Sequence, residues 1–324
     1  MSYYVVTGAA GFIGSRLVAA LNRRGARNII AVDNLEQSAK FKNLAGCDIA
    51  DYVDQTVFVS TLEKLEGNVE AVYHQGACSD TMESNGRFMM ENNYEYSRRL
   101  LDWCQEEQVP FIYASSASVY GAGPEFREER RHEKPLNVYG YSKFLFDQVV
   151  RERLPDASAQ IAGLRYFNVY GPNESHKGRM ASVALHAWEQ LHAEGRVKLF
   201  VGSGGYSDGE QRRDFVYVDD VVAVNLWLLE RRAVSGVFNC GTGRAQSFNR
   251  LAVAVINAVN RTSLTLHEIV AKGLIEYVPF PEALKGKYQS FTEADMSRLR
   301  AAGYPGEFMN VEQGVAAYIK ELQA

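Results

Sequence analysis

Residues 3–15 read YYVVTGAAGFIGS and decide the fold. Aromatic and β-branched residues at 3–7 favour a strand, and the following FIGSRLVAALNRRG has the apolar spacing of a helix. Gly8, Gly11 and Gly14 lie in between in a GxxGxxG pattern. Glycines in such a loop let the backbone approach a pyrophosphate, and the helix N-terminus supplies N–H groups and a positive dipole end. We interpret the loop as a dinucleotide site rather than as a simple turn.

The same alternation of short apolar runs and helical patterns continues after the glycine loop. Such an alternation is typical of βαβ units on a parallel sheet, with a helix after each strand. It predicts a Rossmann-type, doubly wound α/β domain over residues 1–170. The expected strands are NIIAVD (28–33), AVYHQ (71–75), FIYASS (111–116) and QIAGLRY (160–166), and helical stretches reach Glu107 and cover YSKFLFDQVVRERL (141–154).

Beyond Gly171-Pro172 the pattern loosens, which indicates a second part of the chain. A Gly-rich stretch at 201–211 is followed by helical patterns at 247–260 and 311–322. We therefore expect a smaller α/β substrate-binding lobe, mainly from residues 171–324. VFNCGTG at 237–243 has the pattern of a strand that could return to the main sheet. The domain boundary is then discontinuous, with a return segment near 212–243.

Composition restricts the partners and the compartment. The 324 residues are 46% hydrophobic with a net charge of −4, and no Lys/Arg run exceeds a doublet, which argues against nucleic acid. The N-terminus lacks the order of a signal peptide and no apolar run is long enough for a membrane span, so we expect a cytoplasmic protein. The four cysteines are far apart and the histidines lack ligand spacing, so we expect free thiols and no metal.

Asp33 bears on the choice of dinucleotide. It ends the second strand about twenty residues after the glycine loop, where a carboxylate accepts hydrogen bonds from ribose hydroxyls and favours NAD. Lys40 follows seven residues later and could pair with a 2′-phosphate, which would favour NADP. Its alternative role is that of a solvated loop lysine. HQGACS at 74–79 follows another strand, and its small residues would let a cofactor pass the strand end.

The segment YGYSK at 139–143 contains two tyrosines and a lysine. Residues four apart share a helix face and residues two apart do not, so Tyr139 can act with Lys143 whereas Tyr141 cannot. A phenol has a pKa near 10, and a neighbouring ammonium together with a positive nicotinamide ring stabilises its phenolate. We therefore expect Tyr139 to be an acid/base.

Serines stand at the carboxyl end of the strand 111–116, the edge where open α/β sheets bind ligands. Such a serine can hydrogen-bond a reacting oxygen, although a turn serine has the same pattern. The residues alone leave three candidates, Ser115, Ser116 and Ser118.

Together these segments resemble the extended short-chain dehydrogenase/reductase family. The resemblance implies a nucleotide-sugar substrate, an NAD(P) cofactor, and Ser116, Tyr139 and Lys143 as catalytic residues. Ala117 and Ser118 stand where dehydratases of the family carry an acidic pair, so dehydration is not expected. A protein that only senses nucleotide would not need this Ser-Tyr-Lys set. The matching segments are GAAGFIG (8–14), SSASVYG (115–121), YGYSK (139–143), RRDFVYVDDV (212–221) and FNCGTG (238–243).

Within that family the sequence most specifically resembles the epimerases that act on C6 of an ADP-heptose for lipopolysaccharide core synthesis. The resemblance implies hydride removal to bound NADP and its return to the other face, a pentamer, and Lys177 as a second acid/base. The alternative role of Lys177 is that of a surface loop lysine. The alternative function is that of another NAD(P)-dependent nucleotide-sugar epimerase or reductase. The matching segments are VDNL (32–35), HQGACS (74–79), MMENNYEYS (89–97), EKPLNVYGYSKFLFD (133–147), RYFNVYGP (165–172), HKGRMASV (176–183) and LKGKYQSFTEADM (284–296).

The resemblance also implies binding residues, but three departures bear on them. Gln55 stands where the subfamily has a lysine, Arg179 where it has a serine, and the loop 204–211 is longer. NAD therefore stays an alternative to NADP, and the fit of the sugar diphosphate is open. The implied cofactor-binding residues are Gly8, Gly11, Phe12, Ile13, Gly14, Asp33, Asn34, Lys40, Gln75, Gly76, Ala77, Cys78, Ser79, Asn92, Lys143, Val169 and Lys177. The implied substrate-binding residues are Asn168, Arg179, His186, Phe200, Val201, Gly202, Ser203, Arg213 and Tyr288.

Overall fold

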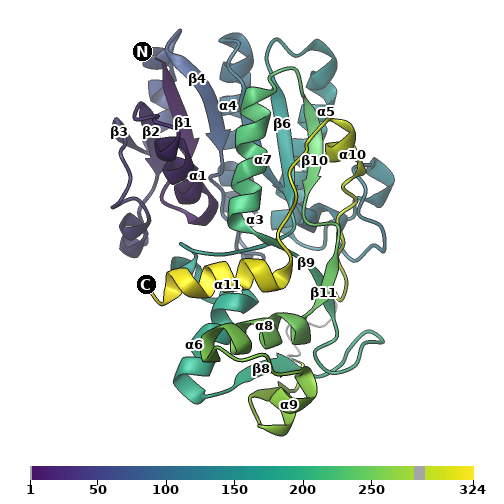
Figure 1. The fold of residues 1–324 in the computed structure, drawn as a ribbon. Coiled ribbons are helices and arrows are strands. Elements are labelled where there is room, and N and C mark those ends of the chain that lie inside the picture. Colours follow the sequence, from purple (N-terminus) through teal and green to yellow (C-terminus); the bar gives the residue numbers. More distant parts are fainter. Residues whose placement is uncertain (1, 281–288) are drawn as a thin grey trace.

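A seven-stranded parallel sheet is the centre of the larger lobe in the computed structural model, which describes residues 2–280 and 289–324 (Figure 1). The strand order is β10-β6-β5-β4-β1-β2-β3, so the chain winds outward in both directions from β1 and β4. This order confirms the predicted doubly wound, Rossmann-type fold. The strands are β1 (Tyr3–Thr7), β2 (Ile29–Asp33), β3 (Asp51–Asp54), β4 (Val69–His74), β5 (Phe111–Ser116), β6 (Ile161–Tyr166) and β10 (Gly236–Cys240).

Helices cover both faces of this sheet. Neighbouring strand residues point to opposite faces, so Val6 packs in the cluster with α1 and α7, whereas Val5 packs in the cluster with α4 and α5. Both valines are fully buried. The helices of the larger lobe are α1 (Phe12–Arg23), α2 (Gln55–Phe58), α3 (Gly86–Met90), α4 (Tyr96–Glu106), α5 (Val138–Arg153), α7 (Val218–Glu230) and α10 (Ser297–Ala301).

The smaller lobe lies at the carboxyl ends of these strands, below the large sheet in Figure 1. It contains a three-stranded sheet of order β11-β9-β7 and a parallel pair of β12 with β8. A separate hydrophobic cluster joins its helices and strands. Its elements are α6 (Val183–Glu194), α8 (Phe248–Asn260), α9 (Leu266–Ala271), α11 (Val311–Leu322), β7 (Asn168–Tyr170), β8 (Val197–Phe200), β9 (Arg212–Tyr217), β11 (Ala245–Ser247) and β12 (Ile275–Val278).

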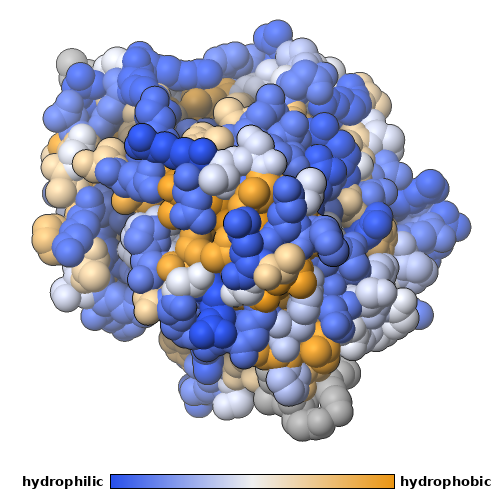
Figure 2. Space-filling model, turned by 60° about the horizontal axis from the view of Figure 1, so that its bottom comes forward, coloured by the Kyte–Doolittle hydropathy of each residue, from blue (hydrophilic) through white to orange (hydrophobic). Residues whose placement is uncertain are grey.

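The chain passes between the lobes more than once. β9 pairs with β7 and β11 in the small sheet, and the chain then returns through α7 to β10, which pairs with β6 in the large sheet. The division at residue 170 stays a prediction. No helix among the described residues is both long and apolar enough to cross a membrane. The face shown in Figure 2 is largely hydrophilic, with apolar residues gathered near its middle.

Candidate active site

The glycine loop between β1 and α1 has no room for side chains. Gly8 has φ +65°, and a Cβ there would lie 2.7 Å from Gly76 Cα. A Cβ on Gly14 would overlap Gly8 O. No side-chain hydrogen bond caps the first turn of α1, whose N-cap is Gly11, in the described part of the chain. The loop is thus a backbone cradle that fits a pyrophosphate at a helix N-terminus.

We predict that Gly14→Ala weakens dinucleotide binding about 5- to 150-fold. The added methyl group would overlap backbone, so the loop must shift, and overpacking of this kind costs about 1–3 kcal/mol. The measurement is the amount of nucleotide released by denaturing the purified protein, with circular dichroism to verify folding. Gly46→Ala is the matched control because nothing lies within 4 Å of its added Cβ. Equal nucleotide content in the two variants would contradict the prediction.

Asp33 joins the glycine loop to Lys40. Its Oδ2 accepts a hydrogen bond from Ala10 N at 2.9 Å, and its Oδ1 accepts from Asn34 N at 2.8 Å and from Lys40 Nζ. Lys40 Nζ also donates to Asn34 Oδ1 at 3.1 Å. The carboxylate is only 5% exposed. A carboxylate and a cation therefore share the end of β2, where an adenosine ribose would bind.

Asn93 fixes the strand-end run at residues 75–79. It lies in the π-helical turn Glu91–Glu95, between α3 and α4, and is fully buried. Its amide accepts a hydrogen bond from Cys78 N at 2.8 Å and donates to Cys78 O at 2.9 Å. It also donates to Ser142 Oγ on α5 at 3.2 Å. The π-turn thus ties the expected cofactor loop to the helix that carries Tyr139.

Tyr139 and Lys143 lie one turn apart on α5, and Ser116 ends β5. Lys143 is 3% exposed, and its Nζ donates to Ala114 O at 2.8 Å. Burial raises the pKa of Tyr139, while a hydrogen bond with Ser116 lowers it. Burial lowers the pKa of Lys143 to about 8, against the opposite effect of the Asp147 carboxylate. The three predicted catalytic groups of the larger lobe are therefore brought to one place.

The structure separates the three candidate serines. Ser115 Oγ donates to Asp147 Oδ2 at 2.9 Å within the core, so it is directed away from the cavity. Ser116 Oγ accepts from Ser118 N at 3.1 Å and from Ser118 Oγ at 2.9 Å. With both lone pairs engaged, the Ser116 hydroxyl can only donate, toward Tyr139 or a reacting oxygen. Ser118 itself lines the cavity.

A buried ionic network lies behind Lys143. Asp147, four residues later on α5, accepts hydrogen bonds from Tyr113 Oη at 2.8 Å and from Arg165 Nε at 2.9 Å. Arg165 also pairs with Glu133 at 2.5 Å, and all three charged side chains are buried. Because buried charges are retained only when paired and hydrogen-bonded, this network fixes β5 and β6 against α5.

We predict that turnover falls as the pH rises through about 8. Lys143 must be an ammonium to stabilise the Tyr139 phenolate, and burial lowers its pKa to about 8, so its charge is lost above that pH. The Asp147 carboxylate raises the pKa of Lys143 and so opposes this loss of charge. His74 on β4 also interacts with Lys143, but burial lowers its pKa and keeps it neutral. The check is a pH profile of kcat at saturating substrate. A rate that stays flat up to a pH of about 10, the ordinary value for a lysine, would contradict it.

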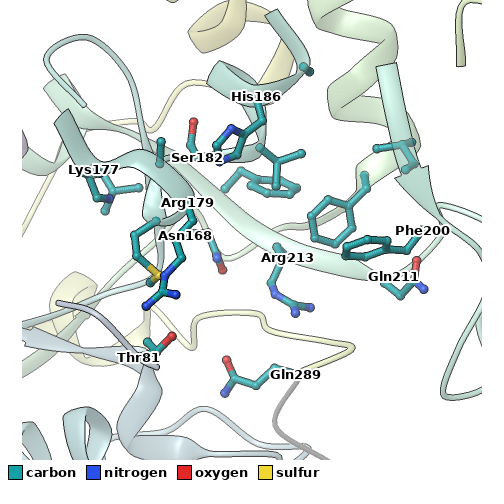
Figure 3. A pocket seen from close by; sticks show the side chains of 18 of the residues that line it. Thr81, Asn168, Lys177, Arg179, Ser182, His186, Phe200, Gln211, Arg213 and Gln289 are labelled. Carbon is teal, nitrogen blue, oxygen red and sulfur yellow. The ribbon is translucent and has the colours of Figure 1, made fainter. Parts of the chain in front are cut away.

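A cavity of about 730 Å³ lies where the two lobes meet. It extends from Ser118 and Asn137, which neighbour the catalytic groups, to residues of the smaller lobe (Figure 3). Val169, an expected cofactor-binding residue, lines the cavity. The expected substrate-binding residues that line it are Asn168, Arg179, His186, Phe200 and Arg213. Of the run 200–203, Phe200 is the lining residue, and Ser203 Oγ accepts a hydrogen bond from Gln211 Nε2 at 3.1 Å. Tyr288 lies outside the described residues.

Lys177 reaches this cavity from the turn Ser175–Met180. Its Nζ lies 5.1 Å from the centroid of the Phe12 ring, at the start of α1. Burial lowers its pKa, while Glu174 raises it. Lys177 is therefore a partly buried amine between the glycine loop and the cavity, and burial favours its neutral form.

Several lining residues carry no signal in the sequence. These residues lie in loops and elements of both lobes, and they reach the cavity only because the two lobes meet there. Gln289, for example, donates a hydrogen bond from Nε2 to Gly121 O across the cavity edge. No motif or spacing would have selected it. The residues of this kind are Thr81, Met82, Leu136, Gln190, Gln211, Phe248 and Gln289.

Comparisons with known proteins agree with this geometry. Residues 4–241 match the family described as the NAD dependent epimerase/dehydratase family. The chain is 64% identical over 326 residues to an ADP-L-glycero-D-manno-heptose-6-epimerase of Thiobacillus denitrificans, covering 99% of this chain and 98% of that protein.

Solved structures give the same result. The Helicobacter pylori ADP-L-glycero-D-manno-heptose-6-epimerase matches with a TM-score of 0.82 and 30% identity, covering 100% of this chain and 96% of that one. The Thermotoga maritima UDP-glucose 4-epimerase with UDP-glucose matches with a TM-score of 0.80 and 27% identity, over 99% and 98% of the two chains. The family model spans both sides of the candidate site. The chain belongs to the NAD dependent epimerase/dehydratase family.

Proposed function

We propose that the chain is an ADP-glyceromanno-heptose 6-epimerase. It interconverts ADP-D-glycero-D-manno-heptose and ADP-L-glycero-D-manno-heptose by transient oxidation at C6. The observation that carries this proposal is the cavity that runs from Lys177 of the turn 175–180 to Ser118 and Asn137, which lie two residues from Ser116 and Tyr139 in the chain. Near-complete coverage by a relative of 64% identity supports the same substrate. The enzyme is an isomerase.

Two proton partners explain how one site can invert a carbon. Tyr139 takes the hydroxyl proton in one substrate orientation, and the Lys143 ammonium stabilises its phenolate. Ser116 donates a hydrogen bond to the same oxygen. Lys177 serves the orientation in which the oxygen lies on the other side. When bound, the nicotinamide dinucleotide accepts and returns the hydride at C6.

The diphosphate and the sugar are held by the smaller lobe. Arg213 lies in the cavity with its guanidinium carbon 5.6 Å from the Phe248 ring centroid, and a guanidinium can bind a diphosphate through two hydrogen bonds. Asn168 and His186 line the wall between it and Lys177 (Figure 3). Phe200 supplies apolar wall. These residues orient the substrate so that C6 lies between the two proton partners.

We propose NADP as the cofactor, with NAD as the alternative. Lys40 is the cation closest to the Asp33 carboxylate, and rotation of its side chain would bring it to a 2′-phosphate. Gln55 supplies no second cation, and its Nε2 instead donates to Asn92 Oδ1 at 2.6 Å. Mass spectrometry of the nucleotide released on denaturation decides between them. In Lys40→Ala the NADP share should fall relative to NAD, and an unchanged share would remove the argument from Lys40.

The remaining features follow from the family resemblance. We propose that the enzyme works in the cytoplasm, supplies the heptose of the lipopolysaccharide core, and assembles as a homopentamer. Light scattering coupled to size-exclusion chromatography measures the number of subunits directly.

The test of the function is direct conversion. The pure protein, with its cofactor bound, is incubated with ADP-D-glycero-D-manno-heptose, and the sugar is followed by NMR. Appearance of the L-glycero epimer without net consumption of added NAD(P)H supports the proposal. Absence of that epimer would sink it, and net NAD(P)H consumption with a keto-sugar would instead identify a reductase.

A further inference from the structure

An ion pair connects the two lobes at the mouth of the cavity. Arg179, from the turn Ser175–Met180, places Nη2 2.6 Å from Oδ2 of Asp80. Asp80 directly follows the expected cofactor loop at 75–79, which belongs to the larger lobe. Arg179 stands where a serine is usual, and Asp80 is not among the expected site residues. The structure pairs the two.

Both partners lie next to residues that line the cavity. Thr81 and Met82 follow Asp80 on one side, and Lys177 and Met180 flank Arg179 on the other. Figure 3 shows Arg179 between Lys177 and Thr81. The pair therefore lies at the edge of the cavity, between the two lobes.

The anchor of this pair is fixed and the other side is a bend. Asp80 Oδ1 accepts a hydrogen bond from Met82 N at 2.8 Å, which orients the carboxylate independently of Arg179. Gly178, between Lys177 and Arg179, has φ +52° with nothing within 4 Å of an added Cβ. A side chain at Gly178 would therefore point into open space. The contact from Arg179 to Asp80 ties this turn to the larger lobe, beside the contact of Lys177 with Phe12.

The ion pair is weak enough to break and re-form in each catalytic cycle. The Arg179 side chain is 68% exposed and that of Asp80 32% exposed. Exposed pairs contribute about 0.2–1 kcal/mol, too little to matter for the fold but enough to favour the closed bend about 1.4- to 5-fold. The cation also stands two residues from Lys177, so closure sets the position of that amine.

We propose that Asp80 is a positioning residue which, through Arg179, holds the Lys177 turn over the cavity and retains the oxidised sugar until its reduction. The inference rests on the proposed function. In the first half of the cycle the C6–H bond breaks, its hydride passes to the nicotinamide dinucleotide, and the hydroxyl proton passes to the base, which leaves a C6 ketone. A ketone that escapes leaves the enzyme with reduced cofactor, so retention is needed for a redox-neutral epimerase.

The test compares the amount of keto-sugar released with the amount of epimer formed. The holoenzyme is incubated with the ADP-heptose, and the keto-sugar in the filtrate is quantified by mass spectrometry per epimer formed. In Asp80→Asn, which keeps an acceptor for Met82 N, the ratio should rise about 1.4- to 5-fold, the share attributed to an exposed pair. Arg179→Gln should raise the ratio of keto-sugar to epimer by the same factor, and the double variant should raise it no further. Arg179→Lys should keep the wild-type ratio because a cation remains.

The matched control is Glu312→Gln, which removes an equally exposed ion pair, to Arg250 at 2.6 Å, outside the cavity. Its ratio should equal that of the wild type. A wild-type ratio in Asp80→Asn, or an equal rise in Glu312→Gln, would overturn the inference. Wild-type enzyme that forms no epimer at all would instead overturn the proposed function, so the two failures are distinguishable.

Discussion

Tyr139→Phe is expected to lower epimerisation about 10²- to 10⁴-fold, the range by which a positioned acid/base accelerates proton transfer. The phenol hydroxyl is bonded to Ser116, and Ser116 is restricted to donating by the two donors of Ser118. The variant therefore removes the proton acceptor while the ring keeps its place on α5. NMR of the ADP-heptose after incubation measures the remaining rate, and nucleotide release on denaturation measures the cofactor.

The control for this variant is Tyr141→Phe. Tyr141 is 45% exposed, and its ring contacts Phe144 with a centroid distance of 6.1 Å. Its hydroxyl should be dispensable, so turnover should remain near the wild-type rate. If Tyr139→Phe turns over normally with cofactor bound, Tyr139 is not the acid/base. Loss of cofactor in that variant would contradict the claim that the ring alone preserves the site.

The large sheet was predictable because its pattern is local. The strands of the larger lobe that we predicted are buried runs, and β1 leads directly into α1. Neighbours such as Val5 and Val6 belong to the two different clusters. β3 and the pairing of β9 were not predictable in this way. β9 is nearly as buried as a strand of the main sheet and yet pairs with β7 and β11. Which sheet a buried strand joins depends on tertiary packing and not on its own residues.

The site was predictable where its chemistry follows a helical repeat or a strand end. The spacing of Tyr139 and Lys143 is one such case. Ser116 could not be separated from Ser115 by pattern, because the choice depends on Asp147, which draws Ser115 into the core. The pair of Asp80 with Arg179 lies 99 residues apart in the chain and exists only because the lobes meet. Such contacts have no local signature.

Lys177→Met is the sharpest test of how C6 is inverted. Methionine keeps an unbranched side chain of four atoms but loses the amine and its contact with the Phe12 ring. Overall epimerisation should fall about 10²- to 10⁴-fold, as for Tyr139→Phe. Burial lowers the pKa of Lys177, which increases the share of its neutral, proton-accepting form at a given pH. Lys320→Met, at an exposed position of α11, is the control and should be unaffected.

The two variants should differ in which epimer they can still oxidise. With enzyme in excess, each purified epimer is incubated separately, and the keto-sugar is measured after quenching. If each base serves one orientation, Lys177→Met should form ketone from one epimer and Tyr139→Phe from the other. Ketone from both epimers in Lys177→Met would show that Tyr139 alone serves both faces, which requires the ketone to turn until its oxygen returns to the same position. The complementary pattern requires instead two fixed bases on opposite sides of C6, one supplied by Tyr139 and the other by Lys177.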